Sequence, residues 1–131
     1  MMRMMNDEAL IHMVRQYGTP TYVFDTEALK NRVRKISEMV GEQVKLCYSI
    51  KANPFLIPAM LEVASHLEVC SPGELEICEA LQVPMESVVY SGVNKEPSDV
   101  KQAVEDGVGI CTAESLRHVM LLQNAAKAAG K

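Results

Sequence analysis

One stretch of the chain decides the fold: residues 67–91 read LEVCSPGELEICEALQVPMESVVYS. Its two ends, Leu67–Cys70 and Val88–Ser91, are apolar runs of the length of a β-strand. Between them, the SPGE segment at residues 71–74 has the form of a capping box with proline at the first helical position, which predicts that a helix begins there. A strand, a helix and a second strand in this order indicate two parallel strands joined by a crossover helix.

The same pattern recurs along most of the chain. Further strand-like runs begin at Leu46 and Val108, so that the four runs start 20 or 21 residues apart. Pro58 and Pro97 fit the first turns of two more helices, and Thr112 is the expected cap of the last helix. Apolar strands joined by helices form a parallel sheet, as in doubly wound sheets and in (β/α) barrels. The faces traced at helical spacing in the last two helices are Val100, Ala103 and Val104, then Leu116, Val119, Met120 and Gln123.

The N-terminal third of the chain lies outside this repeat. Residues 17–20 (YGTP) predict a turn, and residues 21–24 predict a short β-strand. An apolar stripe over residues 29–40 predicts a helix that begins after Asp25 or Thr26. The expected regions are therefore a lead-in strand and helix in residues 1–45 and the repeated units in residues 46–131.

Composition excludes several classes of partner. The 131 residues include 13 basic and 17 acidic side chains, a net charge of −4, without the block of Lys or Arg that nucleic acids or anionic membranes attract. No apolar run approaches the roughly 18 residues that span a bilayer. The initial MMRMM leads into Asn6-Asp7-Glu8 rather than into the apolar centre of a signal peptide. We therefore predict a cytoplasmic protein with no nucleic-acid partner and no membrane partner.

The cysteines and histidines do not suggest a metal site. Their spacings match neither a CxxC pair nor a set of metal ligands. The cysteines are flanked by apolar residues, so we expect them to be reduced and buried, and we expect the histidines to lie in helices. These residues are Cys47, Cys70, Cys78 and Cys111, and His12, His66 and His118.

Lysine 51 is the strongest candidate for chemistry. It follows the first strand-like run in residues 48–54 (YSIKANP), at the strand end where parallel sheets hold their ligands. Strand alternation puts Lys51 on the same face as Cys47 and Ser49. Desolvation or a neighbouring cation can free a lysine amine to form a Schiff base. On spacing alone, a solvated lysine at a strand end is the simpler interpretation.

The surrounding motif resembles a known family. Residues 48–54 resemble the pyridoxal-phosphate lysine motif of the fold-type III decarboxylases, which include diaminopimelate, ornithine and arginine decarboxylases and have an alanine-racemase-like barrel. Residues 17–25 (YGTPTYVFD), 68–75 (EVCSPGEL) and 91–95 (SGVNK) resemble further segments of that family in the same order, the first of them those of diaminopimelate decarboxylases in particular. The resemblance covers about residues 15–125. It implies an α/β fold: the N-terminal portion of a (β/α)8 TIM-type barrel, with about four βα units preceded by a short β-strand and helix.

The resemblance also implies roles for individual residues. Lys51 would be the Schiff-base lysine that holds pyridoxal 5'-phosphate, and Glu68 would lie beside the cofactor, where the family usually has aspartate. Asn53, Asn94 and Lys95 lie at expected strand ends and are candidates for supporting roles, although turn chemistry and surface charge account for them equally well.

The activity implied is that of a carbon–carbon lyase. A pyridoxal-phosphate-dependent decarboxylase acts on a small-molecule amino-acid substrate; for a diaminopimelate decarboxylase, this would be the conversion of meso-diaminopimelate to L-lysine and carbon dioxide in lysine biosynthesis. The full-length family further implies a homodimer.

Two interpretations of the length stay open. A closed barrel has eight units and about 250 residues, whereas four units are visible here, without counterparts of the family's phosphate loop or C-terminal β domain. In the first interpretation, the chain is an N-terminal fragment that is inactive alone. In the second, it is a complete, non-enzymatic half-barrel that self-associates or binds pyridoxal phosphate without turnover. Within the enzyme class, an ornithine or arginine decarboxylase and a racemase are further alternatives.

Overall fold

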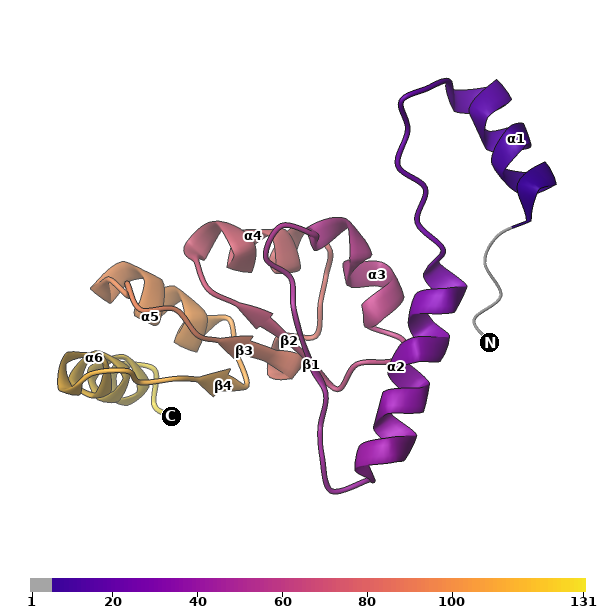
Figure 1. Ribbon diagram of the computed structural model, residues 1–131. Helices are drawn as coiled ribbons and strands as arrows, with labels where there is room; N and C mark the ends of the chain where they lie inside the picture. The colour runs from indigo at the N-terminus through magenta and orange to yellow at the C-terminus, as the bar shows by residue number, and fades with distance from the viewer. Residues whose placement is uncertain (1–5) are drawn as a thin grey trace.

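A sheet of four parallel strands forms the centre of the computed structural model, which describes residues 6–131 (Figure 1). The N-terminal Met1–Met5, which entered the signal-peptide argument, lie outside the described residues. The order β1-β2-β3-β4 in space follows the order in sequence, as in a barrel wall, whereas a doubly wound sheet reverses its strand order. The strands are β1 (Cys47–Ser49), β2 (His66–Val69), β3 (Val88–Tyr90) and β4 (Ile110–Cys111).

The helices follow one another around one side of this sheet (Figure 1). Each strand is followed by a helix, so four βα units are present, as the repeat predicts. Short 3-10 turns at Pro54–Leu56 and Met85–Ser87 precede α3 and β3. The helices are α3 (Ile57–Met60), α4 (Pro72–Ala80), α5 (Pro97–Glu105) and α6 (Leu116–Ala128).

Local capping starts α4 and α6, with two differences from the expected pattern. The Ser71 hydroxyl accepts a hydrogen bond from the Glu74 backbone N–H at 3.2 Å, as a capping box requires. The Glu74 carboxylate, however, accepts from the N–H of Cys70 at 2.7 Å rather than from that of Ser71. Helix α6 is capped by the side chain of Ser115, three residues beyond the expected Thr112.

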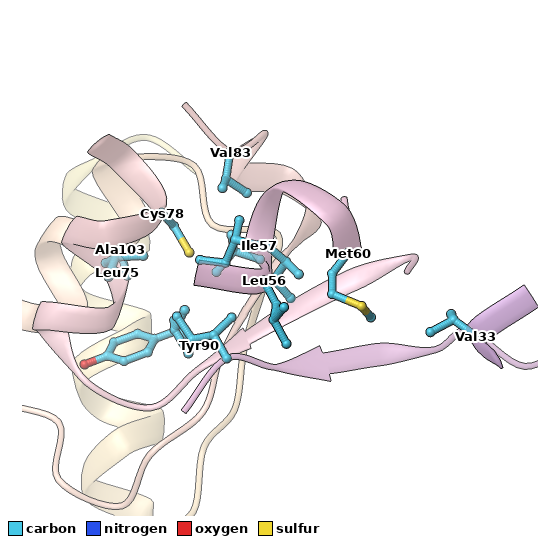
Figure 2. Packing of buried hydrophobic residues seen from close by; sticks show 13 residues of the cluster. Val33, Leu56, Ile57, Met60, Leu75, Cys78, Val83, Tyr90 and Ala103 are labelled. Atoms are coloured by element: carbon cyan, nitrogen blue, oxygen red, sulfur yellow. The ribbon is translucent and has the colours of Figure 1, made fainter. Parts of the chain in front are cut away.

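The hydrophobic core lies between the sheet and its helices (Figure 2). Leu67 and Val69 of β2, and Val88 and Tyr90 of β3, are at most 1% exposed and pack on this side. Because side chains alternate along a strand, the residues between them face the other side of the sheet. This other side, called the interior face below because it faces the inside of a closed barrel, carries Cys47, Ser49, Glu68, Val89 and Ile110.

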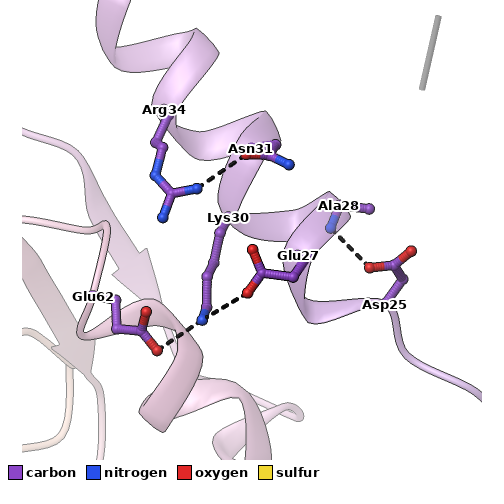
Figure 3. Close-up of polar contacts among 7 residues, drawn as sticks. All are labelled: Asp25, Glu27, Ala28, Lys30, Asn31, Arg34 and Glu62. Carbon is purple, nitrogen blue, oxygen red and sulfur yellow. Dashed lines mark hydrogen bonds and ion pairs between the residues drawn. The ribbon is translucent and has the colours of Figure 1, made fainter. Parts of the chain in front are cut away.

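The lead-in region is helical. The expected helix is present as α2 (Thr26–Val40), and the Asp25 carboxylate caps it by accepting from the N–H of Ala28 at 2.8 Å (Figure 3). Residues 21–24, expected as a strand, pair with no strand in the described part of the chain, because the four-stranded sheet begins with β1. A further helix, α1 (Asp7–Tyr17), buries none of its side chains.

Helix α2 contacts the barrel wall through an ion pair and through apolar side chains. The Lys30 ammonium lies 2.7 Å from the Glu62 carboxylate, beyond α3, and 3.1 Å from that of Glu27 within α2 (Figure 3). Val33 is the buried residue of α2 and belongs to the core cluster. Leu29 of α2, partly buried, packs against the same cluster.

Of the two helix faces expected from the sequence, the one in α5 is buried and the one in α6 is exposed. In α5, Val100 and Ala103 are buried, as their spacing predicts. In α6, the expected face is exposed, with Leu116 at 84% and Met120 at 62%. This helix instead buries His118 and half-buries the apolar residues of its next turns, because packing against α5 selects a different apolar stripe. Across residues 6–131, no helix has the length and apolar character needed to cross a membrane.

Glycine 92 closes the β3–α5 connection under a backbone constraint. Its φ of 111° is one that residues with a side chain rarely adopt, and a Cβ there would collide with the carbonyl oxygen of Cys70. We expect Gly92→Ala to lower the free energy of unfolding by about 2–4 kcal/mol, measured by urea denaturation. Gly73→Ala is the control, because no atom lies within 4 Å of its added Cβ. An equal loss in both variants would contradict this explanation.

Candidate functional site

Lys51 stands at a sharp turn after the first strand. Ile50, directly before it, is fully buried, whereas Lys51 is exposed. The backbone at Lys51 has φ 36°. The turn that contains Lys51 is closed by the N–H of Asn53, which donates to the Ile50 carbonyl at 2.7 Å. Positive φ at a residue with a long side chain is uncommon and is concentrated at functional sites. The turn therefore leads from the buried Ile50 to an accessible amine.

Side chains from three neighbouring strand ends meet at this amine. Lys51 Nζ donates to Cys70 Sγ, directly after β2, at 2.5 Å. Cys70 Sγ lies 3.1 Å from Ser91 Oγ, directly after β3, and Ser91 Oγ donates to Glu68 Oε1 at 2.6 Å. The carboxyl ends of parallel strands share one edge of the sheet, so residues far apart in sequence form one chain of contacts.

The electrostatics of Lys51 differ from the sequence expectation. The hydrogen bond to Cys70 raises the pKa of the Lys51 amine above its ordinary value of 10.5, and the nearby carboxylates of Glu68 and Glu74 act in the same direction. Desolvation acts the other way but is the weaker influence. The expectation of an amine freed by burial or by a neighbouring cation is not met, because Lys51 is exposed and faces acidic groups. At neutral pH the amine is protonated.

Glu68 is held in its ionised form. Its pKa lies below the ordinary value because of the hydroxyls of Ser49 and Ser91, and the Lys51 charge adds to this effect. Ser91 donates a hydrogen bond, whereas the Ser49 hydroxyl faces the carboxylate without hydrogen-bond geometry and is buried without a partner. The half-buried carboxylate therefore carries a negative charge on the interior face beside the lysine.

Lys95, a candidate from the sequence, is buried rather than at the surface. Its ammonium donates to the Gly92 carbonyl at 2.5 Å and lies 5.3 Å from the centre of the Tyr90 ring. These contacts hold the β3–α5 connection that begins with Ser91. Asn53 is exposed, and its backbone carbonyl accepts from the Tyr48 hydroxyl at 3.2 Å. Asn94 is exposed as well.

The expectation of buried cysteines holds for one residue. Cys78 is buried, and burial raises the pKa of its thiol to about 11. Cys70 and Cys111 are half-buried at strand ends, and Cys47 is exposed on the interior face. His66, expected in a helix, begins β2. Composition could not show these placements because they depend on strand register. Within residues 6–131, no group of His, Cys, Asp and Glu side chains is arranged to hold a metal ion.

Comparison with known families identifies the domain. Residues 26–130 match the family described as pyridoxal-dependent decarboxylase, pyridoxal binding domain. The chain belongs to this family. The match begins at the start of α2 and includes all four strands of this pyridoxal-binding domain, and the family resemblance inferred from the sequence motifs is thereby confirmed.

Related proteins agree with this assignment. The pyridoxal-binding domain is 28% identical to diaminopimelate decarboxylase of Aquifex aeolicus, with 94% of the chain and 30% of the relative covered. The diaminopimelate decarboxylase of Mycobacterium tuberculosis is 30% identical, with 92% and 28% covered. The chain thus spans about 30% of the length of these relatives.

Solved structures share the fold. Diaminopimelate decarboxylase of M. jannaschii, crystallised with L-lysine, superposes with a TM-score of 0.75 at 26% identity, over 93% of this chain and 30% of that chain. A lysine/ornithine decarboxylase of Vibrio vulnificus complexed with putrescine superposes with a TM-score of 0.78 at 17% identity, over 92% and 33%. The expected fold, part of a TIM-type barrel, is confirmed.

Pyridoxal phosphate is the cofactor of this family, and the residues present suit it. A cofactor with an aldehyde group needs a primary amine that it can reach, and Lys51 Nζ is exposed at the strand ends. The interior face next to Lys51 adds the Glu68 carboxylate and the buried Ser49 hydroxyl, which has no hydrogen-bond partner in the described chain. These groups offer charge and hydrogen bonds to a polar ligand.

The pKa shift of Glu68 leads to a prediction on stability. Because folding lowers this pKa from 4.5, the ionised carboxylate stabilises the folded chain above that value, and the contribution is lost as the pH falls through the lower pKa of the folded state. The difference in free energy of unfolding between wild type and Glu68→Gln should be constant from neutral pH to about pH 5 and shrink below it. Urea denaturation over a pH series measures this. Glu86→Gln, at an exposed position, is the control; a difference for Glu68→Gln that grows on acidification would contradict the assignment.

Proposed function

We propose that this pyridoxal-binding domain attaches pyridoxal phosphate covalently through Lys51 Nζ. The observation that carries the proposal is the position of this amine, exposed at the carboxyl end of β1 and in contact with residues that follow β2 and β3. Lys95, in contrast, is fully buried and directed at its own turn. The alternative of a solvated strand-end lysine does not account for the contact with Cys70 or for the φ of 36°.

The neighbouring residues have roles in this attachment. Lys51 must release its proton before the nitrogen can form a bond, and Cys70 Sγ, its hydrogen-bond partner, holds the amine at the strand ends. We propose that Glu68 lies against the cofactor, where its ionised carboxylate favours a positively charged group beside it. Ser91 keeps that carboxylate oriented through its 2.6 Å hydrogen bond.

We further propose that the whole protein is an amino-acid decarboxylase, a carbon–carbon lyase acting on meso-diaminopimelate to give L-lysine and carbon dioxide. The names of the relatives support this substrate, as does the YGTP segment at residues 17–20, which resembles that of diaminopimelate decarboxylases. Bound pyridoxal phosphate supplies an electron sink for the charge left when carbon dioxide departs. We place this reaction in the cytoplasm and in a homodimer of the whole protein, as the family resemblance implies.

We also propose different roles for the two parts of the chain. Residues 46–131 form the cofactor-bearing part of the barrel wall, and residues 1–45 are a lead-in attached through Val33 and the Lys30–Glu62 ion pair. The interior face carries exposed Cys47 and Ile110, so further barrel strands are needed to enclose a ligand. The 131-residue chain by itself is therefore proposed to be inactive.

Covalent labelling tests the role of Lys51. The chain is incubated with pyridoxal phosphate, reduced with borohydride and analysed by peptide mass mapping. We expect a single main label at Lys51, lost in Lys51→Ala because the attacking amine is gone. Lys45→Ala, which removes another exposed lysine just before β1, should keep the label. Unchanged labelling in Lys51→Ala would refute the assignment.

Turnover tests the proposed inactivity of the chain alone. Purified 131-residue chain is supplied with pyridoxal phosphate and meso-diaminopimelate, and released carbon dioxide is measured against Lys51→Ala. We expect equal background signals, because the open interior face does not enclose the substrate. Carbon dioxide release by the wild-type chain above that of Lys51→Ala would show that these four βα units suffice for decarboxylation.

A further inference from the structure

Cys70 and Lys51 form a pair of nucleophiles in direct contact at the ends of two neighbouring strands. We propose that this pair is a site of oxidative modification, at which a peroxide links Cys70 Sγ to Lys51 Nζ through a sulfur–nitrogen bond. The two atoms already lie 2.5 Å apart. No rotation of either strand is needed to bring them together, because each is positioned by its own strand end.

The backbone holds both residues in place independently of their contact. The Cys70 N–H donates to the Glu74 carboxylate at 2.7 Å, which ties Cys70 to the first turn of α4. On the neighbouring strand, the Ile50 N–H donates to the Glu68 carbonyl at 3.2 Å, directly before Lys51. The pair is therefore preorganised, and ring closure costs little conformational entropy.

Cys70 differs from the other three cysteines in what surrounds its sulfur. Burial raises the pKa of the Cys47, Cys78 and Cys111 thiols, which holds them in the less reactive protonated form. Only Cys70 receives a hydrogen bond from a lysine ammonium among the contacts of residues 6–131. This contact places the Lys51 nitrogen directly against the Cys70 sulfur, so an oxidised sulfur has a nitrogen within reach. Because Lys51 is exposed and Cys70 half-buried, a small oxidant can reach the pair.

The chemistry balances with hydrogen peroxide as the oxidant. In the first step the Cys70 thiol attacks the peroxide, the oxygen–oxygen bond breaks, and a sulfenic acid and one water are formed. In the second step the Lys51 ammonium gives one proton to solvent and its nitrogen attacks the sulfur; hydroxide leaves and takes up a second proton from the nitrogen to form a second water. Sulfur loses two electrons overall and the peroxide gains them. A sulfenic acid is known to condense with a backbone nitrogen to a sulfenamide, and the proposed step is the same condensation with a lysine nitrogen.

The consequence for the site rests on the proposed function. A Lys51 nitrogen bonded to sulfur cannot bind pyridoxal phosphate, so oxidation blocks cofactor attachment, and a thiol reductant restores it by breaking the sulfur–nitrogen bond. Formation of the link itself requires no cofactor. The proposed sulfur–nitrogen link and the proposed attachment of pyridoxal phosphate can therefore be rejected independently of each other.

Mass spectrometry of the cofactor-free chain tests the link. The chain is treated with hydrogen peroxide, digested with a protease that does not cleave at lysine, and searched for a joined peptide that contains Lys51 and Cys70 and has lost two hydrogen atoms. We expect it in the wild type and in Cys47→Ala, which retains the pair. We expect its complete loss in Cys70→Ala, in Lys51→Arg and after dithiothreitol.

The outcomes that overturn the proposal are distinct from failure of the proposed function. Oxidation of Cys70 to a sulfinic acid without a joined peptide, or a joined peptide that persists in Cys70→Ala, would each overturn it. If the link forms, a second measurement compares borohydride-stable pyridoxal labelling of Lys51 before and after peroxide. We expect labelling to fall in proportion to the linked fraction and to return with dithiothreitol. If the joined peptide forms but the chain never takes up pyridoxal phosphate, the proposed link between Cys70 and Lys51 stands and the proposed cofactor role of Lys51 is rejected.

Discussion

The two-residue alternation along the parallel strands is the constraint on which both the core and the site depend. On β2, Leu67 and Val69 are buried against the helices, so that Glu68, between them, faces the opposite side. The same alternation on β3 buries Val88 and Tyr90 on the helix side. Because every second side chain of a strand is buried against the helices, the side chains between them must point to the interior face, and no further interaction is needed to direct them there.

The ends of the strands bring the reactive side chains together. Parallel strands bring their carboxyl ends to one edge, so Lys51, Cys70 and Ser91, about 20 residues apart in sequence, lie in one series of contacts. The series ends in the ionised Glu68, whose negative charge is compensated by the lysine and by hydroxyl groups. An acidic group of this kind would be costly to bury in an apolar core, but it is stable on a polar, open face.

Features of the fold and of the candidate site could be predicted from the sequence where they depend on contacts between residues close together in the chain. The strand repeat, the start of α2 after Asp25 and the capping of α4 by Ser71 follow from local residue patterns. The resemblance in the lysine motif at residues 48–54 correctly indicated the family. Residues 21–24 were wrongly expected as a strand, because a strand requires a partner and the described chain offers none there. The apolar face of α6 was misjudged because the helix contains two apolar stripes and packing against α5 selects one.

The sequence by itself determined the order of the four strands and of the helices that follow them, and the position of Lys51 after β1, because periodicity, caps and proline act over a few residues. Only the tertiary structure decided that Cys70 touches Lys51, that Glu68 reaches Ser91 and that Lys95 is buried against the Tyr90 ring. These contacts depend on the register and spacing of neighbouring strands, which set the distance between residues on different parts of the chain. The electrostatic state of the lysine is therefore a property of the assembled strand ends, and no local motif contains it.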